Sequence, residues 1–300
     1  MKLTRRRFLA CFATTALSGS VASSPVTSQR FYALGAEAQI TLAGGRQQAE
    51  AAIAACKKEI VAIESAFSLY DPNSMLSQLN RNGYVETDNR FSALLLNALH
   101  MAEKTGGAFD PTIQPLWQAI SSGDDFEQAR KLVGWQDIEI TKSTVRFAQP
   151  GMAVSLNGIA QGFAADRVSA ILKKYGFQNT LVNVGEFAAQ GNKYGRPWLL
   201  GIIDPSSGNI VAHIEPIDTA IATSEPHGTL IGGQAHIFDP LERVGKRWTS
   251  VTVEAREAWR ADALSTAIAA SPVEDAEDLL VAGNATRAWL IDDSGKLKRV

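Results

Sequence analysis

The chain has 300 residues, of which 45% are hydrophobic, and its formal net charge at pH 7 is -2. This length fits one large globular domain or two small ones. The charge balance lacks the basic excess that accompanies nucleic-acid binding, and two cysteines are too few for a disulfide framework.

The first 25 residues have the pattern of an export signal. Residues 4–9 read Thr-Arg-Arg-Arg-Phe-Leu, and a mildly apolar run and small residues ending at Ala22 follow. This pattern resembles a twin-arginine signal peptide, and its apolar run is shorter than the about 20 residues that a membrane span needs. We therefore expect residues 1–25 to be removed, and residues 26–300 to form one domain in the bacterial periplasm without stable membrane insertion.

Apolar periodicity predicts helices and strands along the rest of the chain. Helices are expected at 47–69, 73–80, 88–105, 124–133, 159–176, 259–270 and 273–280. Strands are expected at 31–42, 137–140, 144–148, 152–156, 179–184, 198–204, 209–214, 218–222, 234–238, 248–254, 286–291 and 297–300. Runs of neighbouring strands with helices before and after them favour an α+β fold with mixed, largely antiparallel sheets and packed helices.

The stretch Ala153 to Asp166 joins an apolar run to a helix through a bend at Asn157-Gly158. A strand that turns through glycine into a helix directs backbone amides and the positive end of the helix toward one place, where anions bind well. Such turns are also common in proteins without any ligand, so ordinary packing explains this stretch equally well on its own.

Three further stretches contain residues suited to chemistry. Pro111 keeps Asp110 out of the α region, so this acid stands on a stiff, non-helical segment. Asp262 and Thr266 are four residues apart in a helix and share one face, which suits a hard divalent ion, although a helix cap and a packed threonine give the same pattern. His236 follows a strand and is suited to proton transfer near neutral pH, or is a structural histidine.

Eight stretches in this order and rough spacing resemble the ApbE family of FAD:protein FMN transferases, and together they span nearly all of the predicted domain. The resemblance implies an ApbE-like, T-fold-like architecture. It includes Leu156 to Asp166, which reads LNGIAQGFAAD. The stretches are 34–36, 67–80, 107–111, 156–166, 182–186, 221–224, 236–240 and 261–266.

The resemblance implies a transferase that uses FAD as substrate and Mg²⁺ as cofactor, attaches FMN to a threonine or serine of an exported redox flavoprotein, and releases AMP. His236 matches the residue that acts as catalytic base in the family, and Asp262, Thr266 and the Gly158 carbonyl match its magnesium ligands. The residues that match FAD contacts are Leu34, Tyr70, Ala108, Phe109, Asp110, Ser155, Gln161 and Ile237.

The sequence departs from the family pattern at three of these positions, because Leu34, Ser155 and Gln161 stand where the family usually has Met, Asp, and Lys or Glu. Two other activities therefore stay open: an FAD pyrophosphatase that yields FMN and AMP, and a non-catalytic periplasmic FAD-binding accessory protein. The Asn-Gly-Ile-Ala-Gln-Gly form, the Val-Gly-Glu turn and the signal look most like the NosX branch, which is associated with nitrous oxide respiration. That branch implies a NosR-like membrane flavoprotein as acceptor.

Overall fold

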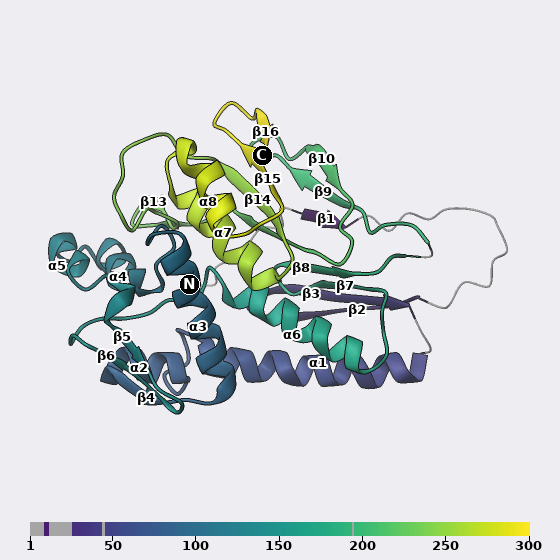
Figure 1. Cartoon of the computed structure of the whole chain (residues 1–300), viewed down its shortest axis with the longest axis horizontal. Helices are drawn as coiled ribbons and strands as arrows, with labels where there is room; N and C mark the ends of the chain where they lie inside the picture. Colours follow the sequence, from purple (N-terminus) through teal and green to yellow (C-terminus); the bar gives the residue numbers. More distant parts are fainter. Residues whose placement is uncertain (1–8, 12–25, 44–45, 194) are drawn as a thin grey trace.

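The computed structural model describes residues 9–11, 26–43, 46–193 and 195–300. Its main element is an eight-stranded sheet with the order β16-β15-β14-β11-β8-β7-β3-β2, in which every neighbouring pair is antiparallel (Figure 1). These strands confirm the predicted α+β class. In chain order they are β2 Val26–Ala33, β3 Ala36–Ala43, β7 Thr180–Asn183, β8 Phe187–Gln190, β11 Ala220–Ser224, β14 Ser250–Ala255, β15 Arg287–Ile291 and β16 Leu297–Arg299.

Three helices cover one face of this sheet: α1 (Arg46–Phe67), α6 (Ala160–Lys174) and α7 (Ala258–Ala270). They pack side by side, α1 on α6 and α6 on α7 (Figure 1). Apolar residues of the helices and of the sheet face beneath them form the larger core, in which Ile40, Ile60 and Leu264 are fully or almost fully buried. This burial is the main force that holds the helices on the sheet.

A second, smaller core lies on the other face of the sheet. Phe187, Ile221 and Trp289 from the large sheet pack there against Leu200 and Ile202. The last two belong to a three-stranded sheet with the order β1-β9-β10, made by Leu9–Cys11, Leu200–Ile203 and Ile210–Ile214. The large sheet is thus buried on both faces at its centre, and all six residues of β14 are buried.

The remaining elements surround one end of the large sheet. Among them α2 is preceded by the N-cap Ser74, whose hydroxyl accepts a hydrogen bond from Ser77 N, and is followed by Gly83 in the left-handed region, where its sequence predicts the end. The other elements are α2 Met75–Asn82, β4 Tyr84–Glu86, α3 Asn89–Lys104, α4 Gln114–Ser122, α5 Phe126–Arg130, β5 Ile138–Ile140, β6 Thr144–Phe147, β12 Leu230–Ile231, β13 Gln234–Ala235 and α8 Ala276–Ala282, with short 3-10 turns at Pro111–Ile113, Trp135–Asp137 and Val273–Asp275.

The helices α6 and α7 cap each other, which fixes their relative position. The Asp166 carboxylate of α6 accepts hydrogen bonds from Ala258 N and Trp259 N at the start of α7, both at 2.9 Å. In return, Asp262 Oδ2 of α7 accepts from Gly162 N in the first turn of α6, also at 2.9 Å. A Cβ atom on Gly162 would lie 2.2 Å from the Ala258 carbonyl oxygen, so this close approach requires glycine.

Three predicted strands are wrong in part. The expected strand 31–42 is a hairpin, because Leu34 and Gly35 both have positive φ (50° and 74°) and reverse the chain between β2 and β3. Residues 152–156 are extended but pair with no strand. Instead, Val154 N and O bond the Asn80 side chain, and Ser155 N donates to Pro111 O. The expected strand 234–238 is reduced to β13.

The predicted signal sequence lies outside the described residues, apart from the three residues of β1, which pair with β9. The division into residues 1–25 and 26–300 therefore stays a prediction. In the described part of the chain, no helix is long and apolar enough to cross a membrane.

Candidate active site

A cavity of about 240 Å³ opens at the start of α6, beside Asp262, Thr266 and Ala270 of α7. The predicted site residues all line it, except Leu34. These eleven residues come from widely separated parts of the sequence, which the fold brings to one place. They are Tyr70, Ala108, Phe109, Asp110, Ser155, Gly158, Gln161, His236, Ile237, Asp262 and Thr266.

Asp262, Thr266 and Gly158 lie together at the junction of α6 and α7. Asp262 is buried, and its Oδ2 accepts a hydrogen bond from Gly162 N at the start of α6, where the sequence predicts an anion site. Thr266 stands one turn further along α7, and its Oγ1 lies 3.3 Å from Ser224 Oγ at the end of β11. The backbone of Gly158 passes so close that an added Cβ would lie 2.8 Å from Thr266 Oγ1.

His236 lines the same cavity from the loop after β13. Its ring Nδ1 is 2.9 Å from Pro226 O and 3.1 Å from Thr229 O. Carbonyl oxygens only accept hydrogen bonds, so Nδ1 carries the proton in the neutral ring, and the lone pair that accepts a proton is on Nε2. The two carbonyls therefore select the tautomer of this histidine.

Ala108, Phe109 and Asp110 form one wall of the cavity together with Ser155. Asp110 has an extended backbone (φ -130°), as Pro111 predicts, and its Oδ1 accepts from Thr112 N and Thr112 Oγ1 at 2.8 and 2.6 Å. Burial raises the pKa of the Asp110 carboxyl above its ordinary value, although the bonds from Thr112 oppose this rise. Ser155 N donates a hydrogen bond to Pro111 O, and this bond fixes the distance between Ser155 and the segment that carries Asp110.

Leu34 lies beside the cavity and does not line it. Gln161 Nε2 is 3.4 Å from Leu34 O, and the next residues of the hairpin, Ala36 and Glu37, reach the cavity instead. On its other side, Gln161 packs on Gly185, where an added Cβ would lie 2.4 Å from Gln161 Cδ. Gln161 therefore connects the β2–β3 hairpin to the turn after β7.

The cavity has an unusual charge balance. Five acidic side chains line it, and among the described lining residues none is a lysine or an arginine. A dinucleotide bound here would carry two further negative charges on its diphosphate, so an additional cation is needed to offset the repulsion. The acids are Glu37, Asp110, Glu186, Glu225 and Asp262.

Sequence reasoning missed Glu225 as a site residue. It is buried, and its Oε1 has no hydrogen-bond partner in the part of the chain that the structure describes. Burial, together with the nearby Asp204, raises the pKa of this carboxyl to about 8. The signal available in the sequence is its place next to Thr223-Ser224 at the end of a strand, a position that plain turn chemistry explains equally well.

The donor set at the helix junction fits magnesium. No group of three or more His, Cys, Asp or Glu side chains that could hold a metal ion occurs within the described ranges. A site at Asp262, Thr266 and the Gly158 carbonyl would thus supply one carboxylate and two neutral oxygens. Magnesium in proteins is commonly bound by one or two carboxylates, with water and substrate phosphates completing its coordination.

Comparison with known proteins identifies the family of the chain. A curated relative from Treponema pallidum, named FAD:protein FMN transferase, is 28% identical over 253 residues, which cover 69% of this chain and 70% of the relative. The crystal structure of an ApbE protein from Thermotoga maritima superposes with a TM-score of 0.81 at 26% identity, and the match covers 92% of this chain and 97% of that protein.

The flavin transferase ApbE from Vibrio cholerae shares the fold, with a TM-score of 0.80 at 23% identity over 92% of this chain and 97% of that one. The model of the ApbE family matches residues 34–290, which include every predicted site residue. The resemblance seen in the sequence is confirmed, and the chain belongs to the ApbE family.

Proposed function

We propose that this protein transfers FMN from FAD to a threonine or serine hydroxyl of an exported redox protein, with Mg²⁺ as cofactor, and releases AMP. The observation that carries the proposal is the meeting of Asp262, Thr266 and Gly158 with His236 in one acid-lined cavity. The relatives named FAD:protein FMN transferase support the same reaction.

In the proposed reaction, the acceptor oxygen forms a bond to the phosphorus on the FMN side of the diphosphate. The bond from that phosphorus to the bridging oxygen breaks, and AMP departs with this oxygen. The hydroxyl proton goes to Nε2 of His236, which the bonds of Nδ1 leave as the basic nitrogen. A proton acceptor fixed by two carbonyls is already oriented before the substrates bind, which lowers the cost of reaching the transition state.

Asp262, Thr266 and the Gly158 carbonyl would hold the magnesium ion. A bound Mg²⁺ would neutralise charge on the diphosphate and favour in-line geometry. The described lining holds acidic side chains and neither lysine nor arginine, so the positive charge that offsets an anionic substrate would come from this ion. Asp262 is oriented for this role by its bond from Gly162 N.

The aromatic and apolar lining residues, with Tyr70, Phe109 and Ile237 among them, would contact the ring systems of FAD. Ser155 and Gln161 lie in the cavity although they depart from the family pattern, and Leu34 would act through its contact with Gln161. Neutral side chains at 155 and 161 change the local charge without removing the wall, since both positions are held by backbone or side-chain contacts.

We place the reaction in the periplasm, after export by the twin-arginine pathway, on the basis of the pattern in residues 1–25. The NosX-like features of the sequence favour an acceptor of the NosR type, which is a membrane flavoprotein. Export of this acceptor's flavin-carrying part would bring its hydroxyl to the same compartment.

The purified protein, incubated with FAD, Mg²⁺ and an acceptor domain, separates the proposed activity from the two alternatives. We expect an acceptor that is fluorescent because it carries covalently bound FMN, together with free AMP. Free FMN without acceptor labelling would identify an FAD pyrophosphatase, and bound, unchanged FAD would identify a carrier. Either of these outcomes would refute the proposed transfer.

A further inference from the structure

The loop that carries His236 is attached to the rest of the molecule through Asp239. His236, Ile237, Phe238 and Pro240 line the cavity, whereas the Asp239 side chain is buried on the opposite side of the loop. Its Oδ1 accepts from Leu241 N at 2.9 Å, and its Oδ2 accepts from Arg243 N at 3.2 Å. These bonds close a tight turn directly after the cavity residues.

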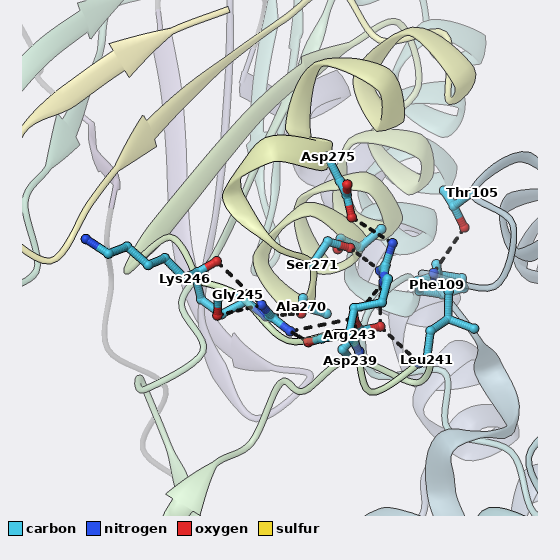
Figure 2. Close-up of polar contacts among 12 residues, drawn as sticks. Thr105, Phe109, Asp239, Leu241, Arg243, Gly245, Lys246, Ala270, Ser271 and Asp275 are labelled. Atoms are coloured by element: carbon cyan, nitrogen blue, oxygen red, sulfur yellow. Dashed lines mark hydrogen bonds and ion pairs between the residues drawn. The ribbon is translucent and has the colours of Figure 1, made fainter.

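The guanidinium group of Arg243 joins this turn to a different part of the fold (Figure 2). Its Nε and Nη2 donate to the two carboxylate oxygens of Asp239 at 2.8 and 3.1 Å. On its far side, Nη2 donates to Ser271 Oγ and Nη1 donates to Asp275 Oδ2, both at 2.8 Å. This two-sided geometry uses the planar fork of arginine, which the single ammonium group of a lysine cannot reproduce.

A second arginine reinforces the same connection. Arg247 Nε donates to Ala270 O at the end of α7, and Arg247 Nη2 lies 3.6 Å from Asp239 Oδ2. Its Nη1 also donates to the Gly245 carbonyl within the loop at 2.9 Å. A cation at the C-terminus of a helix also interacts favourably with the helix dipole.

The partners of Arg243 beyond the loop all belong to the end of α7 and the turn that follows it. Asp262 and Thr266 lie on the same helix, two turns and one turn before Ala270. We propose that Arg243 is a positioning residue, which holds His236 at a fixed place relative to Asp262 and Thr266 by locking Asp239 to the end of α7. This inference rests on the proposed function, because it concerns the distance between its proton acceptor and its metal ligands.

A double-mutant cycle tests whether Arg243 acts through His236. The variants are Arg243→Lys, His236→Asn and the double variant, and kcat for FMN transfer is measured with FAD, Mg²⁺ and acceptor at saturation. Arg243→Lys should lower kcat about tenfold or more, since a misplacement of about 1 Å is costly in catalysis. The double variant should lose no more activity than His236→Asn alone.

Arg260→Ala is the matched control. Arg260 lies on α7 and also bonds a carboxylate and a backbone carbonyl, those of Glu257 and Gly283, but it does not line the cavity. Its kcat should stay within about twofold of the wild-type value, because most substitutions away from a site have small effects. If Arg243→Lys matches this control, or if its loss multiplies fully with that of His236→Asn, the positioning role is refuted.

Two further measurements keep the inference testable. If Arg243→Lys does not fold, Asp275→Ala replaces it in the cycle, because this change removes only the outermost contact. If the wild-type protein transfers no FMN, the proposed function fails, and amide hydrogen exchange then tests the lock by itself. The backbone amides at positions 241 and 243 should exchange faster in Arg243→Lys than in Arg260→Ala. Equal exchange rates in the two variants would overturn the inference.

Discussion

Gly158 and Thr266 meet so closely that no side chain fits between them. A Cβ atom at position 158 would lie 2.8 Å from Thr266 Oγ1 and 3.0 Å from Thr266 Cγ2. The bend before α6 and the inner face of α7 therefore reach the cavity together, with the threonine hydroxyl directly beside the glycine backbone. This contact brings the proposed metal ligands Gly158, in the bend before α6, and Thr266, in α7, to one place.

Replacing Gly158 by alanine should displace Thr266. We expect the change to lower FMN transfer about tenfold or more and to raise the Mg²⁺ concentration needed for half-maximal activity. Overpacking also costs about 1–3 kcal/mol of unfolding free energy. Gly134→Ala is the control, since an added Cβ there meets its nearest atom at 3.7 Å. Equal magnesium dependence in both variants would contradict the assigned site.

Asp262→Asn should remove metal-dependent turnover while leaving the fold intact. The amide oxygen of asparagine can still accept the bond from Gly162 N, so the capping of α6 is kept and only the charge is lost. We expect a loss of about 10²-fold or more in transfer, with an unfolding free energy within about 1 kcal/mol of the wild type. Urea unfolding and labelling assays measure the two quantities. Wild-type activity in this variant would refute the magnesium site.

His236→Asn separates the structural bond of the ring from its proposed chemistry. The asparagine amide can donate toward Pro226 O, as Nδ1 does, but has no counterpart to Nε2. Transfer should fall about 10² to 10⁴-fold, while the dissociation constant for FAD changes by only a few fold. His100→Asn, at a residue of α3 whose ring contacts Trp259 of α7, should leave the rate unchanged. If both variants transfer FMN equally fast, His236 is not the base.

Glu225 should make the protein less stable as the pH rises. Its folded-state pKa of about 8 lies above the ordinary 4.5, so the folded state binds the extra proton between these values. The free energy of unfolding therefore decreases across this window, by at most about 1.4 kcal/mol per pH unit from this group. Glu225→Gln, which is neutral at every pH, should match the wild type near pH 5 and be more stable near pH 8. Parallel stability curves from pH 5 to 8 would exclude a protonated Glu225.

The sequence predicts much of this architecture because its local signals agree with the packing. The caps at Ser74 and Gly83 bound α2, and β14 has the polar–apolar alternation of a strand, SVTVEA, although all six of its residues are buried. The strand expected at 31–42 is wrong because a leucine stands at a positive φ, a conformation that its side chain disfavours and only the neighbouring Gly35 announces.

The site likewise contains residues that local motifs predict and contacts that they do not predict. Asp262, Thr266 and His236 stand in recognisable motifs, and the fold brings them to one cavity. Contacts between distant segments leave no local pattern, so the fork of Arg243 between Asp239, Ser271 and Asp275 was not foreseeable. The strand expected at 152–156 is wrong for a similar reason, because the Asn80 side chain replaces a neighbouring strand.

The stoichiometry of the reaction tests the proposed transfer of FMN most sharply. Intact-mass spectrometry of the acceptor and chromatography of the nucleotides give the FMN attached and the AMP released in one sample. We expect one AMP for each FMN bound to the acceptor, with both products dependent on Mg²⁺ and both absent with Asp262→Asn. Release of AMP without FMN on the acceptor would contradict the proposed transfer. Transfer that persists after a chelator has removed Mg²⁺ would contradict the magnesium dependence.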